Sequence, residues 1–194
     1  MSAAPRYPRD LGYAGLRMSA DEYLALGETQ DRYELIDGIV VMMSPSPFAS
    51  HNEIAAEIVY QLKSFADRSG GVRIFPETDV RFSANTIYKP DISVYRSERL
   101  PAKVQRLDLP PDLVVEVLST GTQALDLITK RDDYERFGVG EYWAVDPKSG
   151  DVRCWRRHAQ RLLEASPTGD ALECAVLPGM VLDLARVRAL ADAT

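Results

Sequence analysis

Two carboxylates, Asp91 and Glu116, are the residues of this chain whose type and position could support catalysis. Glu116 lies inside the apolar run of residues 113–118, a pattern typical of a strand that is covered on both faces. A charged carboxylate in such a strand is unfavourable unless an opposite charge or a cation compensates it. A buried ion pair with an arginine and a metal site are therefore both open interpretations of Glu116.

The position of Asp91 favours a metal site. Asp91 begins the predicted strand 91–96, whose alternation puts it on the face opposite Ile92 and Val94. If this strand neighbours that of Glu116, the two carboxylates converge at one end of a sheet. Their mutual repulsion would favour a hard divalent cation between them. An aspartate after a proline is, however, also common in turns.

Lys130 is a third candidate. The residues Asp126, Lys130 and Tyr134 are spaced at i, i+4 and i+8 on a predicted helix over about 123–137, so they form one stripe along it. On one interpretation the ammonium group points over the end of the sheet toward the two carboxylates. The alternative is an ordinary exposed Asp–Lys pair, which contributes little to stability.

Local signals predict the elements that would position these side chains. A capping box of Ser19 and Glu22 begins a short helix that runs to about residue 26. Asp37-Gly38 predicts a β-hairpin between strands 32–36 and 39–43. A second capping box, with Ser50 as N-cap, begins a helix that runs to about residue 68.

The second half of the chain alternates strands and helices. Strands are predicted over 72–83 with a bend at Pro76, over 91–96 and over 112–119. Two more lie within 141–157, and a last strand, a turn and a short helix end the chain. We expect a mixed α+β (α/β) domain over residues 18–194, with a central sheet flanked by helices, after a flexible arm over 1–17.

Composition narrows the class of protein. No apolar run is long enough to span a membrane, and the N-terminus lacks a secretory signal. Cys154 and Cys174 are predicted to be buried free thiols, which together with the other signals favours the cytoplasm. The net charge of −6 argues against general attraction to nucleic acid. Basic residues do cluster in 96–106 and in 153–161. Each cluster is either a local patch that binds nucleic acid or an ordinary solvated face.

Six short motifs, taken in order, identify a known family. They are YELIDG, the His51 at a helix start, KPDISV, DLVVEVLS, the Asp126/Lys130/Tyr134 spacing and GVGEYWAVDP. Together they resemble a large bacterial family of putative restriction endonucleases within the PD-(D/E)XK nuclease superfamily. The resemblance extends from about residue 18 to 184 and implies a restriction-endonuclease-like fold.

The resemblance also implies roles for individual residues. Asp91 and Glu116 map to the metal-binding Asp and Glu of the superfamily, with Mg²⁺ or Mn²⁺ as the cofactor. Leu118 stands where the motif lysine is usual, and Lys130 is similar to the migrated lysine of this family.

Two further positions match the family. Glu34 matches a recurrent acidic position and would be a further catalytic residue, or else an ordinary polar residue beside a turn. His51 would contact a phosphate of the nucleic acid, or else merely complete the start of its helix.

The implied function is a divalent-metal-dependent endonuclease that hydrolyses phosphodiester bonds of nucleic acid, with DNA as the expected substrate. A homodimer is expected because cutting both strands of a duplex favours two-fold symmetry. The main alternative is an inactive module that keeps the nuclease fold and binds nucleic acid or protein. Leu118 and the acidic net charge favour this alternative.

Overall fold

The computed structural model describes residues 12–43, 49–119 and 125–191. The helices are α1 (Ala20–Leu24), α2 (Ala49–Ser69), α3 (Arg131–Phe137) and α4 (Leu184–Arg188). A π-helical segment, Leu125–Lys130, runs directly into α3, and a 3₁₀ turn spans Ser97–Arg99. The strands are β1 (Tyr33–Ile36), β2 (Ile39–Met42), β3 (Val72–Pro76), β4 (Val80–Arg81), β5 (Ile87–Tyr88), β6 (Ile92–Arg96), β7 (Leu113–Val117), β8 (Glu141–Val145), β9 (Val152–His158), β10 (Arg161–Ala165), β11 (Ala171–Glu173) and β12 (Val181–Asp183).

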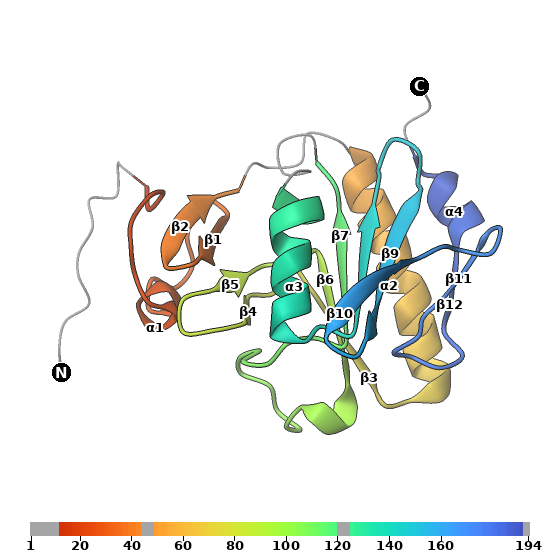
Figure 1. Cartoon of the computed structure of the whole chain (residues 1–194), viewed down its shortest axis with the longest axis horizontal. Coiled ribbons are helices and arrows are strands. Elements are labelled where there is room, and N and C mark those ends of the chain that lie inside the picture. The colour runs from red at the N-terminus through yellow and green to blue at the C-terminus, as the bar shows by residue number, and fades with distance from the viewer. Residues whose placement is uncertain (1–11, 44–48, 120–124, 192–194) are drawn as a thin grey trace.

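A mixed sheet of six strands forms the centre of the fold, in the order β10-β9-β8-β7-β6-β3. Only β7 and β8 pair in parallel; the other neighbours are antiparallel. Helices α2 and α3 lie on opposite faces of this sheet (Figure 1). The expected mixed α+β fold with a central sheet between helices is confirmed.

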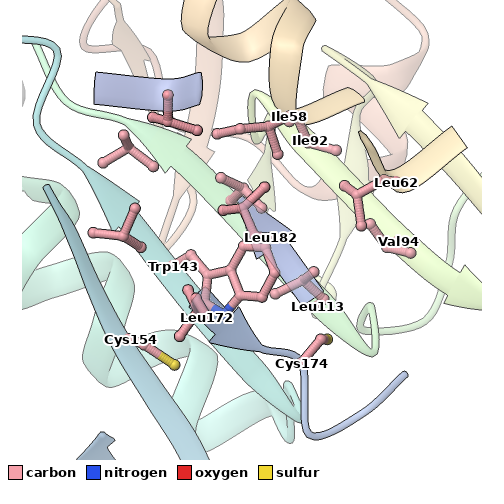
Figure 2. Packing of buried hydrophobic residues seen from close by; sticks show 14 of the residues in the cluster. Ile58, Leu62, Ile92, Val94, Leu113, Trp143, Cys154, Leu172, Cys174 and Leu182 are labelled. Carbon is pink, nitrogen blue, oxygen red and sulfur yellow. The ribbon is translucent and has the colours of Figure 1, made fainter. Parts of the chain in front are cut away.

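The larger apolar core lies between α2 and the central sheet (Figure 2). Ile54, Ile58 and Leu62 recur at helical spacing and are fully buried, as their periodicity predicts. They pack against residues of β6 such as Ile92 and Val94. Each such side chain contributes about 1.5–3 kcal/mol through burial. This packing holds in place β6, the strand that Asp91 directly precedes.

A smaller sheet, in the order β2-β1-β5-β4, lies beside the central one (Figure 1). Its hairpin turns at Asp37 and Gly38, whose φ values of 47° and 79° are both positive, as a type I′ turn requires. The predicted hairpin is confirmed. Strand β5 has only two residues and is not predicted by the sequence.

The expected strand 72–83 is divided between the two sheets. Strand β3 pairs with β6 in the central sheet, and β4 pairs with β5 in the small one. The bend expected at Pro76 falls one residue later, at Glu77, which has a positive φ of 42°. This turn lets one stretch of chain connect both sheets.

Helix boundaries differ from the sequence-based expectation in two places. The capping box of Ser19 and Glu22 is present at α1. Ser50, by contrast, is not an N-cap, because α2 already includes Ala49 and so Ser50 is itself helical. The helix expected over 123–137 begins as a π-helix before it becomes α3, and residues 123 and 124 lie outside the described residues.

The expected N-terminal arm can be followed from residue 12. There the chain runs beside the hairpin, with the amide of Gly15 donating to the carbonyl of Val40 at 2.7 Å. Tyr13 and Leu16 pack against the small apolar core around β1 and α1. Residues 12–17 therefore pack against the small sheet, and residues 1–11 lie outside the described residues.

The C-terminal part contains more strands than the single one expected after β9. Three short strands, β10 to β12, follow it, and β11 pairs with β12 as a separate ribbon. Cys154 and Cys174 are buried free thiols, as predicted. In the described part of the chain, no helix combines the length and apolar character that crossing a membrane requires.

Candidate functional site

The central sheet brings Asp91 and Glu116 together. Strands β6 and β7 are antiparallel neighbours in which Ile92 pairs with Val115, so Asp91, just before Ile92, and Glu116, just after Val115, lie at the same end. The backbone amide of Asp91 donates to Oε2 of Glu116 at 3.3 Å. Asp91 and Glu116 are only 5% and 3% exposed. The strand adjacency on which the sequence-based hypothesis depended is therefore present.

The carboxylate of Asp91 is held from both sides. Its Oδ2 accepts from the backbone amide of Val117 at 2.8 Å and lies 3.4 Å from Nε2 of His51. Its Oδ1 lies 3.3 Å from Nη2 of Arg32. Burial disfavours the charged carboxylate, but the hydrogen bond and charge of His51, with the charge of Arg32, outweigh burial and lower the pKa of Asp91.

Glu116 is held mainly by α3 and the π-helix before it. Its Oε1 accepts from the Tyr134 hydroxyl at 2.8 Å and from the Lys130 ammonium at 3.1 Å. Burial raises the pKa of Glu116 to about 8; Lys130 opposes this rise, and the negative charge of Asp91 adds to it. The neighbouring carboxylates of the site thus have pKa values that are shifted in opposite directions.

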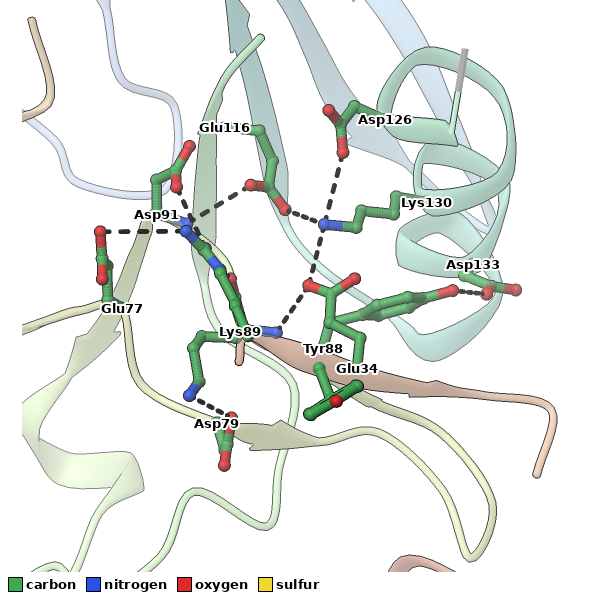
Figure 3. A network of polar contacts seen from close by, with 12 residues as sticks. Glu34, Glu77, Asp79, Tyr88, Lys89, Asp91, Glu116, Asp126, Lys130 and Asp133 are labelled. Atoms are coloured by element: carbon green, nitrogen blue, oxygen red, sulfur yellow. Dashed lines mark hydrogen bonds and ion pairs between the residues drawn. The ribbon is translucent and has the colours of Figure 1, made fainter. Parts of the chain in front are cut away.

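Lys130 lies at the centre of an acidic cluster (Figure 3). Its Nζ is 3.0 Å from Glu34, 3.1 Å from Glu116 and 3.3 Å from Asp126. The ammonium also lies 5.4 Å from the centre of the Tyr88 ring. Burial alone would lower the pKa of Lys130, but the three carboxylates raise it well above its ordinary value. The lysine of the next helix does reach the sheet end that carries Glu116.

Glu34 comes to this cluster from the small sheet. It is 1% exposed, and its Oε1 accepts from the Lys89 backbone amide at 2.9 Å and from Lys130. Its Oε2 is buried without a hydrogen-bond partner among the described residues. An unpaired buried carboxylate oxygen is unusual and calls for a partner such as a cation or water. Glu34 is therefore part of the cluster rather than an ordinary polar residue beside a turn.

His51 lies in the first part of α2 and is also buried, at 6% exposure. Burial alone would lower the pKa of His51, but the hydrogen bond to Asp91 and the negative charge of Asp91 outweigh burial, so the pKa of His51 is raised. Its Nε2 contacts the carboxylate of Asp91 at 3.4 Å, so His51 lies beside the acidic pair. The structure thus assigns His51 a contact with Asp91 beyond its place at the helix start.

Three further residues belong to the site and are not among those predicted from the sequence: Arg32, Tyr88 and Asp133. The Tyr88 hydroxyl makes a short hydrogen bond to Asp133, which fixes the ring beside Lys130. Both Arg32 and Tyr88 are near recognised motifs, because they precede YELIDG and KPDISV. That proximity was the one signal available, and it does not specify a contact.

The carboxylates provide hard oxygen donors. Among residues 12–43, 49–119 and 125–191, no group of three or more His, Cys, Asp or Glu side chains is arranged to hold a metal ion. Mg²⁺, however, is usually bound by one or two carboxylates, with water and phosphate completing its shell. Asp91, Glu116 and the unpaired Oε2 of Glu34 fit that donor chemistry.

The two basic clusters are largely occupied by partners within the fold. Arg96 and Arg99 both pair with the buried Asp112. Arg157 donates to backbone carbonyls at the end of α3, including that of Glu135 at 2.6 Å. The interpretation of these clusters as a local nucleic-acid patch receives no support from these contacts.

Comparisons with known proteins agree with this architecture. A search of curated proteins found no match. Among solved structures, the chain is similar to a putative nuclease belonging to DUF820 from Anabaena variabilis ATCC 29413, with 23% sequence identity and a TM-score of 0.76. The match covers 89% of this chain and 98% of that one, and shows a shared fold. A family model described as a putative restriction endonuclease matches residues 20–185, which supports a nuclease-like function. The chain therefore belongs to the Uma2 family of putative restriction endonucleases.

Proposed function

We propose that the protein is a divalent-metal-dependent endonuclease that hydrolyses phosphodiester bonds, with DNA as substrate. The observation that supports this most is the buried convergence of Glu34, Glu116 and Asp126 on Lys130, with Asp91 directly beside Glu116. Buried carboxylates are rare, and sites where burial and charge shift pKa values strongly are often catalytic. Membership of a restriction endonuclease family supports nucleic acid as the substrate class.

Mg²⁺ or Mn²⁺ would be held by Asp91 and Glu116. When bound, such a cation lowers the pKa of a water molecule and neutralises charge that develops on the phosphate. His51 and the Val117 amide keep the Asp91 carboxylate oriented, and Tyr134 does the same for Glu116. These contacts would hold the pair rigid, as precise metal sites require.

Lys130 would supply a fixed positive charge beside the reacting phosphate. In the structure its ammonium group donates hydrogen bonds to Glu34 and Glu116 and forms an ion pair with Asp126. A water molecule or phosphate oxygen that approaches Lys130 would compete with these three carboxylates. Glu34, whose Oε2 has no hydrogen-bond partner among the described residues, could then orient a water molecule.

The occupied state of Lys130 also favours a second candidate function. A lysine paired to three carboxylates is what an inactive module would use to stabilise a former active site. Leu118, at the position of the usual lysine, is buried and offers no catalytic group. Such a module would bind nucleic acid or protein without hydrolysis, and it would need no divalent cation.

Divalent-ion binding and DNA hydrolysis separate the two functions. Purified protein is titrated with Mn²⁺ by calorimetry and incubated with plasmid and single-stranded DNA, beside Asp91→Asn, Glu116→Gln and the control Glu164→Gln. Glu164 is an exposed partner of Arg153 and should behave as wild type. We expect Asp91→Asn to abolish Mn²⁺ binding and Glu116→Gln to abolish hydrolysis. Equal background activity in wild type and Glu116→Gln would contradict the enzymatic function.

The homodimer and the cytoplasmic location stay predictions. Sedimentation of the purified protein with and without duplex DNA tests the first.

A further inference from the structure

Arg32 connects the acidic site with the surface. Its Nη2 lies 3.3 Å from Oδ1 of Asp91 and donates to the carbonyl of Lys89 at 2.8 Å. Its Nη1 is 3.9 Å from Glu77, at the limit of an ion pair. The side chain is 31% exposed, whereas that of Asp91 is 6% exposed. Arg32 is therefore the partially exposed cation on a buried carboxylate.

The two oxygens of Asp91 have different partners. Oδ2 faces the protein interior, where the Val117 amide and the buried His51 hold it. Oδ1 is covered by the Arg32 guanidinium. A cation that approached Oδ1 from solution would have to displace or share this contact, because both carry positive charge. Arg32 and a divalent ion thus compete for the same oxygen.

A pocket of about 580 Å³ opens on the other side of Arg32. It is lined by residues of α1 and of the α1–β1 connection, and its charged residues are Arg32 and Lys89 with the carboxylates Glu28, Asp31, Glu77 and Asp79. Lys89 reaches Asp79 at 3.4 Å, and both of these side chains are about one-third exposed. The two cations of this lining, Arg32 and Lys89, are also the ones that contact the acidic site, through Asp91 and Glu34 respectively. A guanidinium suits a phosphate because it can donate two parallel hydrogen bonds.

We propose that Arg32 binds the phosphate backbone of the nucleic acid at this pocket, and that it covers Asp91 until a divalent cation takes its place. In the metal-free protein the guanidinium neutralises the buried carboxylate. Once the cation has taken over that charge, Arg32 is released toward the pocket and pairs with a substrate phosphate. This inference depends on the proposed metal-dependent function, and it names the residue that links metal binding to substrate binding.

The pKa of Arg32 agrees with this position. Burial alone would lower it, but the charges of Asp91, Glu116 and other nearby carboxylates raise it. The guanidinium consequently stays charged in the metal-free site and can be transferred to a phosphate without loss of its proton.

The test compares Arg32→Met with wild type and with a matched control, Arg186→Met. Methionine keeps an apolar stem but removes the charge. Arg186 is half-exposed and pairs with Glu57, and its helix α4 lies at the opposite end of the molecule from α1 (Figure 1). Each protein is titrated with Mn²⁺ by calorimetry. Binding to a nuclease-resistant phosphorothioate DNA duplex is measured by fluorescence anisotropy over a range of salt concentrations, with Mn²⁺ and with EDTA.

We expect opposite changes in the two affinities. Arg32→Met should bind Mn²⁺ more tightly, by up to roughly fivefold, which is the scale of one lost competing charge contact. It should bind the duplex more weakly in Mn²⁺, with the slope of log affinity against log salt reduced by about 0.9, the value of one phosphate contact. Arg186→Met should match wild type in both. A folding defect would instead weaken both affinities of Arg32→Met.

Two outcomes overturn the inference separately from the proposed function. If Asp91→Asn abolishes Mn²⁺ binding but Arg32→Met leaves both the Mn²⁺ affinity and the salt slope unchanged, the metal site stands and the role of Arg32 is refuted. If wild type binds no Mn²⁺ at all, the proposed metal site and the displacement of Arg32 are both refuted. In EDTA, Arg32→Met and wild type should have the same salt slope, because Arg32 then covers Asp91; a smaller slope of the variant in EDTA would refute the displacement.

Discussion

Replacing Lys130 with methionine removes the cation that three buried carboxylates share. Lys130 is 2% exposed, and its carboxylate partners are 1–3% exposed. Removing one partner of a buried ion pair costs about 3–5 kcal/mol, because the remaining charge is left without compensation. Methionine has a similar shape, so a cavity adds little to this cost. We expect Lys130→Met to lose about 3–5 kcal/mol of unfolding free energy near neutral pH, out of a typical 5–15 kcal/mol.

The loss should also grow at high pH. The pKa of Glu116 is about 8 in the folded wild type, where Lys130 opposes the effect of burial. An unfolded glutamate has a pKa of about 4.3, so between about pH 4.3 and pH 8 the folded protein binds one proton more at Glu116 than the unfolded chain does. The contribution of Glu116 to stability therefore falls as the pH rises through this range. Without Lys130 the folded pKa of Glu116 is higher still, so the fall continues above about pH 8 at up to about 1.4 kcal/mol per pH unit. The difference between variant and wild type therefore widens there.

Urea unfolding in EDTA, followed by tryptophan fluorescence, measures this difference at several pH values. The matched control is Lys63→Met, which removes an exposed pair with Asp67 and should change the free energy by less than about 0.5 kcal/mol. A loss below about 1 kcal/mol in Lys130→Met would refute the role of Lys130 in compensating the carboxylates. If the difference in unfolding free energy between Lys130→Met and wild type stays constant between about pH 7 and pH 9, the coupling of Lys130 to Glu116 is refuted.

Three other predictions follow from burial. Because the pKa of Glu116 is about 8, the proposed cation must displace a proton from Glu116 below that pH. The Mn²⁺ affinity measured by calorimetry should therefore rise by up to about tenfold per pH unit until about pH 8 and then level off. An Mn²⁺ affinity that does not depend on pH would contradict this. Burial raises the pKa of the Cys154 thiol to about 12 and also raises that of Cys174, so both should resist iodoacetamide in the native protein and react in urea. Mass spectrometry checks this, and rapid native labelling of either thiol would count against their burial. Gly140→Ala should lose about 1–3 kcal/mol of unfolding free energy, because a Cβ at this position would lie 2.8 Å from the carbonyl oxygen of Asp112. An unchanged melting temperature would show that the backbone moves aside without cost.

Local sequence patterns predicted the elements that hold the site. The Asp37-Gly38 turn specifies its hairpin because few residue pairs tolerate two positive φ values. The apolar run around Glu116 predicted a buried strand, and β7 is buried at all five positions. The i, i+4 spacing placed Asp126 and Lys130 side by side even though the segment is a π-helix.

Contacts between distant parts of the chain could not be predicted in this way. Arg32 meets Asp91 across 59 residues, and Tyr88 meets Asp133 across 45. No local pattern encodes either contact, because each depends on how the small sheet lies against the central one. The N-terminus of α2 was misplaced at Ser50, since a capping sequence is a preference and does not fix where a helix begins.

The division of the site between two sheets has a consequence for synthesis of the protein on the ribosome. Glu34 leaves the ribosome early, yet its partner Lys130 lies 96 residues later in the chain. Chains grow by about 5–20 residues per second, so the cluster cannot assemble until most of the protein has been made. A shorter nascent chain would lack the cation that Glu34 and Glu116 share, and under the proposed function a truncated product that ends before Lys130 would not cut the nucleic acid around it.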